Sequence, residues 1–108
     1  MRLTPIQTDG IFKAFSHFLT QTKANLFLYG SRVDDKKKGG DIDLLLVVYD
    51  EGSKTRLLSE KHLILSKIKS NIGDQKIDLK IALPGELETD PFLLLATEGN
   101  KKIKLFSF

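Results

Sequence analysis

The amino-acid sequence predicts an α+β fold, in which a small mixed β-sheet is flanked by helices. Helix-like and strand-like segments alternate along the chain. The first two strand-like segments are too close in sequence for a parallel crossover, so we expect them to be antiparallel neighbours. The helical stretch between the second and third strands does permit a parallel crossover. The 108 residues, 41% of them hydrophobic, suit a single domain over 1–108 with its own core.

The first predicted element is an amphipathic helix that ends near Thr22. Thr4 and Pro5 are typical of a helix start, with an N-cap residue followed by proline in the first turn. Gly10 interrupts the pattern, and residues 8–9 are an alternative start. Apolar residues recur at helical spacing and predict one buried stripe, which consists of Ile11, Phe12, Phe15, Phe18 and Leu19.

Two short apolar strands are predicted next, at residues 24–29 and 41–49. Gly30 ends the first strand, and residues 31–40 form a polar loop, in which one helical turn can follow Ser31. The second strand contains an apolar run at 44–48 without alternation. Such a run is typical of a strand that is covered on both faces.

A long helix is predicted after the turn at 50–53, with Ser53 as its N-cap. The pattern continues to about Asn71, and Gly73 is placed to end it. The expected buried stripe consists of Leu58, Leu65, Ile68 and Ile72, adjoined by Leu57 and Ile64.

The last third of the chain predicts one strand and two shorter elements. The strand spans 75–83, and Pro84 with Gly85 ends it. Pro91 can start a helix that continues to about Glu98. The apolar segment 103–108 forms either a short final strand or a tail that packs on the core or meets a partner, including a second copy of the chain. One face of the predicted strand carries Ile77, Leu79 and Ile81.

Composition and charge exclude several classes of function. The chain has no cysteine, so disulfides and thiolate metal sites are excluded. It has no apolar run of membrane-spanning length and no signal-peptide core, so we expect a cytoplasmic protein. A net charge of +3 is only mildly basic. The lysines at 36–38 can attract a polyphosphate or simply be solvated, and few aromatic residues lie outside the apolar stripes. Nucleic acid is therefore not an expected partner.

Three aspartates are the strongest candidates for a functional site. Asp41 and Asp43 are two residues apart, so on a strand both side chains leave the same face, about 7 Å apart along the backbone. Asp78 lies on the face of its strand opposite Ile77 and Leu79. Taken alone, the pair is more typical of a solvated strand end or turn, and Asp78 of simple alternation with its side chain facing water. If the third strand pairs beside the second, the three carboxylates can together hold two Mg²⁺ ions about 3.5–4 Å apart.

The turn after the first strand is a candidate phosphate-binding element. Gly30 allows the backbone to approach a phosphate closely or to adopt positive φ. The backbone N–H groups that follow, together with the Ser31 hydroxyl, can bind phosphate oxygens. Arg32 can add a bidentate contact. The alternative interpretation is an ordinary turn that ends a strand.

These motifs together resemble the minimal nucleotidyltransferase family of the DNA polymerase β-like nucleotidyltransferase superfamily. The resemblance rests on Gly30–Ser31, on the pair Asp41 and Asp43, and on Asp78, and it covers nearly the whole chain. It implies the nucleotidyltransferase fold and transfer of a nucleotide with two Mg²⁺ ions. The three aspartates would bind the metals, and Asp78 would also help to deprotonate the acceptor hydroxyl. Gly30 and Ser31 would hold the triphosphate.

The resemblance also implies a partner. Many small members are antitoxins encoded beside a HEPN-type RNase toxin, and some transfer AMP from ATP to a tyrosine of that toxin. One departure from the family pattern is Asp35, which stands where a glycine is expected. An added carboxylate near phosphates disfavours nucleotide binding unless it turns away. This departure favours a second hypothesis, a binding module that neutralises its partner by occlusion. A third hypothesis, a subunit that acts on RNA ends, is allowed by the mildly basic charge.

Overall fold

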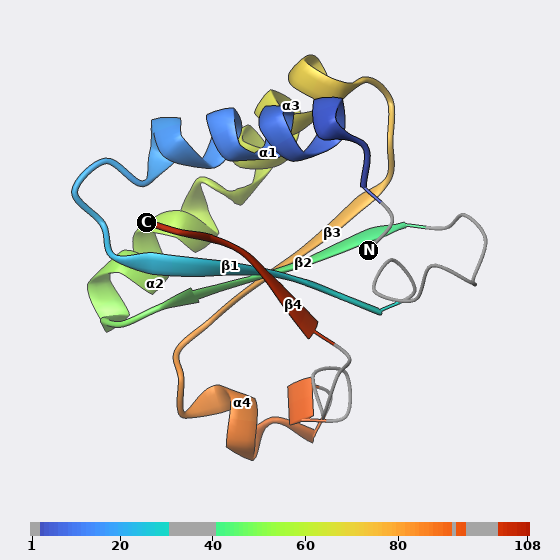
Figure 1. The fold of residues 1–108 in the computed structure, drawn as a ribbon. Helices are drawn as coiled ribbons and strands as arrows, with labels where there is room; N and C mark the ends of the chain where they lie inside the picture. The colour runs from blue at the N-terminus through green and yellow to red at the C-terminus, as the bar shows by residue number, and fades with distance from the viewer. Residues whose placement is uncertain (1–2, 31–40, 92, 95–101) are drawn as a thin grey trace.

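The computed structural model describes residues 3–30, 41–91, 93–94 and 102–108, and it has the predicted α+β architecture. Four strands form one mixed sheet in the order β3-β2-β1-β4 (Figure 1). None of the helices in these ranges is long and apolar enough to cross a membrane. The elements are α1 (Pro5–Phe18), β1 (Ala24–Tyr29), β2 (Ile42–Val48), α2 (Glu51–Ser59), α3 (Lys61–Ile72), β3 (Ile77–Ala82), α4 (Glu86–Thr89) and β4 (Lys102–Ser107).

The strand pairing confirms the expectations from the lengths of the connections. β1 and β2 are antiparallel neighbours. β2 and β3 are parallel, with α2 and α3 forming the crossover between them. The alternative left open for the C-terminal segment is resolved, because β4 pairs antiparallel with β1 on the side away from β2. β1 and β2 are therefore the two central strands.

The sheet separates two apolar clusters of different size. α1 and α3 cover one face and α4 lies on the other (Figure 1). The main core lies under α1, α2 and α3 and includes Ile42, Leu44, Leu46 and Val48 of β2. The smaller cluster lies on the opposite face and consists of Tyr29, Leu45, Val47, Ala82 and Leu93. The predicted covering of the second strand on both faces is thus confirmed.

The first helix begins as predicted but ends earlier. The hydroxyl of Thr4 accepts from the Gln7 backbone N–H at 3.1 Å, and the Gln7 side chain accepts from the Thr4 backbone N–H at 3.0 Å. The predicted end near Thr22 is wrong, because the helix stops at Phe18 and Gln21 has a left-handed φ of 63°. The chain must turn there to enter β1.

Gly10 does not interrupt the helix but lies directly against the C-terminal part of α3. The residue is buried, and a Cβ at this position would overlap the side chains of Asn71 and Ile72. The Asn71 side-chain amide donates to the Gly10 carbonyl at 2.9 Å. The phenylalanine stripe is only partly core: Phe15 is buried, whereas Phe12 is 40% exposed and packs against Phe106 and Phe108 of the C-terminal segment.

The predicted long helix is two helices, α2 and α3, which are separated at Glu60. The predicted N-cap is also wrong: Asp50 is the cap, and its carboxylate accepts from the Ser53 backbone N–H at 2.8 Å and from the Ser53 hydroxyl at 2.7 Å. Glu60 adopts φ −98° and ψ 3°, outside the helical region. Gly73 ends α3 as predicted, with φ 95°.

The buried stripe of α2 and α3 matches the prediction except at Leu58: Ile68 is buried, and Leu65 and Ile72 are partly buried against the main core. Leu58 is 46% exposed, whereas Leu57, Ile64 and Ile68 are buried. Apolar residues occupy both members of the pairs 57–58 and 64–65. The periodicity alone therefore does not decide between Leu57 and Leu58, and packing buries Leu57, whereas Ile64 and Leu65 both contact the main core.

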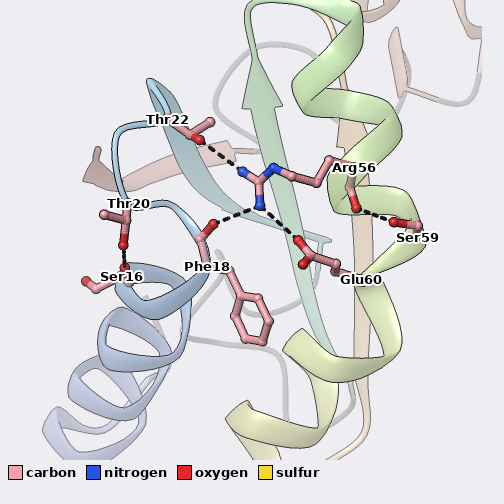
Figure 2. Close-up of polar contacts among 7 residues, drawn as sticks. All are labelled: Ser16, Phe18, Thr20, Thr22, Arg56, Ser59 and Glu60. Atoms are coloured by element: carbon pink, nitrogen blue, oxygen red, sulfur yellow. Dashed lines mark hydrogen bonds and ion pairs between the residues drawn. The ribbon is translucent and has the colours of Figure 1, made fainter.

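Arg56 connects α2 to the segment between α1 and β1 (Figure 2). One guanidinium nitrogen donates to the Phe18 carbonyl at 3.2 Å and to the Glu60 carboxylate at 2.8 Å. The other donates to the Thr22 hydroxyl at 2.9 Å. The side chain thereby satisfies a carbonyl at the C-terminal end of α1, where a positive charge is favourable.

The third strand has the predicted face, with Ile77, Leu79 and Ile81 packed in the main core. The short helix α4 that follows was not expected. It is held by Glu86, whose carboxylate accepts from Lys54 Nζ at 2.7 Å and from the Leu83 backbone N–H at 2.8 Å. Of the predicted helix at 91–98, residues 91, 93 and 94 are helical, and the remainder lies outside the described residues.

Candidate functional site

A row of polar side chains crosses three strands at one end of the sheet. Asp43 on β2 is the register partner of Tyr29 on β1 and of Asp78 on β3. Residues that are directly paired on neighbouring strands project from the same face, and the strands lie about 4.8 Å apart. The condition for bringing the two aspartates together, pairing of the third strand beside the second, is therefore met.

This row lies on the face with the smaller apolar cluster. Asp43 precedes Leu45 by two residues, so both side chains project from the same face of β2, and Leu45 is fully buried there. Tyr29 itself belongs to the cluster. The carboxylates consequently stand at the border between an apolar layer and solvent, where water is partly excluded.

The electrostatic consequence is clearest at Asp43. Partial burial raises its pKa above the ordinary value, and the negative charges of Asp78 and then Asp41 raise it further. The carboxylates of Asp41 and Asp78 therefore both act on Asp43, although Asp78 lies on a different strand. Mutual repulsion of this kind is relieved when a cation binds between the groups, which is the arrangement that Mg²⁺ sites use.

Asp41 lies beside the pair and has another partner. It precedes β2, and its Oδ2 is 3.6 Å from Lys76 Nζ. The Lys76 carbonyl also accepts from the Ile42 backbone N–H at 3.0 Å, which ties the two strand starts together. Within the described residues, no group of three or more His, Cys, Asp or Glu side chains is already gathered closely enough to hold a metal ion. The assignment of Asp41, Asp43 and Asp78 as metal ligands stays a prediction.

Gly30 fits against the Asp43 carboxylate. Its φ is +76°, and a Cβ at this position would overlap Asp43 Oδ2. The backbone can therefore come this close only because the residue has no side chain. Ser31 and Arg32, the other predicted nucleotide-binding residues, lie outside the described residues, as do Asp35 and the lysines at 36–38.

Tyr29 is the residue of this row that the sequence did not identify. It is 3% exposed, and this burial is the main reason that the pKa of its hydroxyl is raised. The negative charges of Asp78 and then Asp43 raise the pKa further, and a weak hydrogen-bonding contact with Asp78 acts in the same direction. That contact falls short of full hydrogen-bond geometry, so the buried hydroxyl has no partner among the described groups. The antiparallel pairing expected for the first two strands would have placed Tyr29 opposite Asp43 if its register had been known.

Comparison with known proteins agrees with the geometry. The protein family described as nucleotidyltransferase domain matches residues 9–104, from within α1 into β4. Among solved structures, a Sulfolobus solfataricus protein assigned as a nucleotidyltransferase matches with a TM-score of 0.58 and 14% identity, over 94% of this chain and 78% of the other. At that identity the likeness shows the fold. No protein with curated annotation matches the sequence.

Proposed function

The chain belongs to the nucleotidyltransferase domain family, and from this premise we propose that it transfers AMP from ATP to a hydroxyl group of a partner protein. The observation that carries the proposal is the parallel register that sets Asp43 beside Asp78, with Gly30 against the Asp43 carboxylate. A nucleotidyl transfer requires a place for negative phosphates, cations to neutralise them and an oriented acceptor. The end of β1 and the starts of β2 and β3 supply groups for each task.

The donor set fits divalent cations. Carboxylate oxygens are the ligands that Mg²⁺ prefers, and repulsion among the aspartates disfavours the metal-free arrangement. Asp43 and Asp78 would hold two Mg²⁺ ions, with Asp41 joining them when it leaves Lys76. Bound Mg²⁺ would neutralise charge on the phosphates as the nucleotide is transferred.

The remaining tasks fall to the chain itself. The backbone at Gly30 approaches the carboxylates without a side chain in the way, so a triphosphate can come equally close. Asp78 would orient the acceptor hydroxyl and accept its proton. Ser31 and Arg32 are proposed as the phosphate contacts that follow Gly30 in sequence.

The position of Asp78 supports a large acceptor. β3 is an edge strand, and the described part of the chain places no further strand beyond it. A hydroxyl on the surface of another protein can therefore approach from that side. The resemblance to minimal nucleotidyltransferases supports a HEPN-type toxin as this protein, with the present chain as its antitoxin.

The test uses intact mass spectrometry. The purified chain would be used to capture its partner from a lysate of the source cells, and the complex would be incubated with Mg²⁺ and each nucleoside triphosphate in turn. We expect the partner to gain one or more AMP units with the parent and none with Asp43→Asn or Asp78→Asn. Asp74→Asn is the matched control, because Asp74 is exposed in the turn before β3. Full transfer by Asp43→Asn would exclude the proposed role of that residue.

A second candidate function is neutralisation by occlusion alone. It is favoured by the contact of Asp41 with Lys76, which keeps one of the three carboxylates engaged elsewhere. On this hypothesis the partner binds but its mass is unchanged with every triphosphate. Neutralisation that persists after replacement of all three aspartates by asparagine would establish it.

A further inference from the structure

Tyr29 combines two properties that rarely occur together. Its ring is packed in the smaller apolar cluster, and its hydroxyl is buried without a hydrogen-bond partner among the described groups. A buried polar group without a partner destabilises the folded state, so such groups are uncommon and usually have a function. Phenylalanine would provide the same apolar packing without the buried hydroxyl.

The surroundings of the hydroxyl indicate which side chain it can donate a hydrogen bond to. Tyr29 is opposite Asp43 in the register, and the next strand places Asp78 beside Asp43. The hydroxyl already makes a weak contact with Asp78, and the charges of both carboxylates act on it. A phenol is a good donor to a carboxylate. A tyrosine hydroxyl is ordinarily protonated at neutral pH, so it is available as a donor.

We propose that Tyr29 is a positioning residue, whose hydroxyl donates to the Asp78 carboxylate and fixes its orientation for binding a divalent cation. This inference rests on the function proposed above. The hydroxyl would occupy one carboxylate oxygen of Asp78 and leave the other for the cation. Groups that orient a metal ligand in this way commonly contribute roughly 10-fold or more to metal affinity.

The test measures Mn²⁺ binding in the absence of nucleotide, by calorimetry or by electron paramagnetic resonance. We expect Tyr29→Phe to weaken Mn²⁺ binding by about 10-fold. Its thermal unfolding midpoint should equal or exceed that of the parent, because the ring stays in the apolar cluster and the unpartnered hydroxyl is gone. Replacement of Tyr29 by 4-aminophenylalanine, which keeps a donor at the same ring position, should restore much of the affinity.

Tyr49→Phe is the matched control. Tyr49 is 46% exposed, follows the far end of β2, and accepts a hydrogen bond from the Asn25 side chain. Its substitution should leave Mn²⁺ binding unchanged. Parent-like Mn²⁺ affinity in Tyr29→Phe would overturn the positioning role while leaving the proposed function intact. A parent protein that binds no Mn²⁺ would overturn both, so the two failures are distinguishable.

Discussion

At the scale of single residues, Gly30 shows how closely the backbone and the site depend on one another. Two separate features, the φ of +76° and the proximity of Asp43 Oδ2, exclude a side chain at this position. Either feature alone would favour glycine, and together they make the position sensitive to a single methyl group. The residue therefore offers a direct test of the site.

We expect Gly30→Ala to lower both stability and transfer activity. A left-handed backbone costs a residue with a Cβ roughly 1–2 kcal/mol, and the overlap with Asp43 displaces that carboxylate. Denaturant unfolding and the AMP-transfer assay would measure the two effects. Gly85→Ala is the control, because Gly85 has φ −64° and a Cβ added there would meet no neighbouring atom within 4 Å. That substitution should be neutral or stabilise by about 0.5 kcal/mol. Equal losses in the two variants would contradict the argument.

The common face of Asp41 and Asp43 was predictable from the sequence, because a spacing of two residues matches the period of a strand. The place of Tyr29 was not predictable, since it depends on the register between β1 and β2. A shift of one residue would have turned the tyrosine to the opposite face. The contact of Asp41 with Lys76 likewise arises from the pairing of β2 with β3, which local patterns do not specify.

At the scale of elements, Arg56 determines how α2 meets the end of α1. Its guanidinium reaches a backbone carbonyl, a hydroxyl and a carboxylate, which come from three different segments (Figure 2). Only a planar group with several donors can serve them together. A lysine would keep the charge but would lose at least one of these contacts.

Arg56→Lys should therefore destabilise the protein by about 1–2 kcal/mol, within the range for loss of a hydrogen bond to a charged group. Lys13→Ala provides the comparison, because Lys13 forms an exposed ion pair with Asp9 at 3.0 Å within one helix. Such pairs contribute about 0.3–0.5 kcal/mol. Thermal and urea unfolding of both variants would measure the difference. A smaller loss for Arg56→Lys than for Lys13→Ala would exclude the bridging role.

The element boundaries show which physical signals the sequence contains. Strand β1 was predicted to the residue, because its apolar run is bounded by polar residues and by Gly30. The separation of α2 from α3 was not predicted, because position 60 is a glutamate and not one of the residues, glycine or proline, that usually mark a helix break. The four-residue helix α4 is too short to show a period, and it depends on the contact between Lys54 and Glu86.

At the scale of the whole molecule, the clustered carboxylates of the site lower the free energy of unfolding of the metal-free protein at neutral pH. The pKa of Asp43 is raised above its ordinary 3.8, so the folded state retains this proton more strongly than the unfolded chain does. The free energy of unfolding therefore falls as pH rises from about 3.8 through the raised pKa of Asp43. Glu86 acts in the opposite direction: the hydrogen bond from Lys54 lowers its pKa, and the stability this brings is lost as pH falls through that lowered value.

The two contributions can be separated with Asp43→Asn. In metal-free buffer, this variant should be more stable than the parent at neutral pH, because it removes the cost of ionising Asp43 beside Asp78. The difference should vanish below pH 3.8, where the parent is protonated as well. Unfolding by urea across this range, in the presence of a chelator, would measure it. A variant that is less stable than the parent at neutral pH would show that the carboxylate contributes to folding instead.

The order of the strands has a consequence for synthesis on the ribosome. β1 is a central strand, yet its second neighbour is β4, in which Ser107 pairs with Asn25. The segments that contain Tyr29, Asp43 and Asp78 are all synthesised before the residues of β4, so β1 cannot yet pair with β4 at that stage. One edge of β1 must therefore remain unpaired until the segment that forms β4 has been synthesised, and an unpaired strand edge is prone to pair with other chains. Protection of that edge, by a chaperone or by a partner that binds the growing chain, would increase the yield of folded protein.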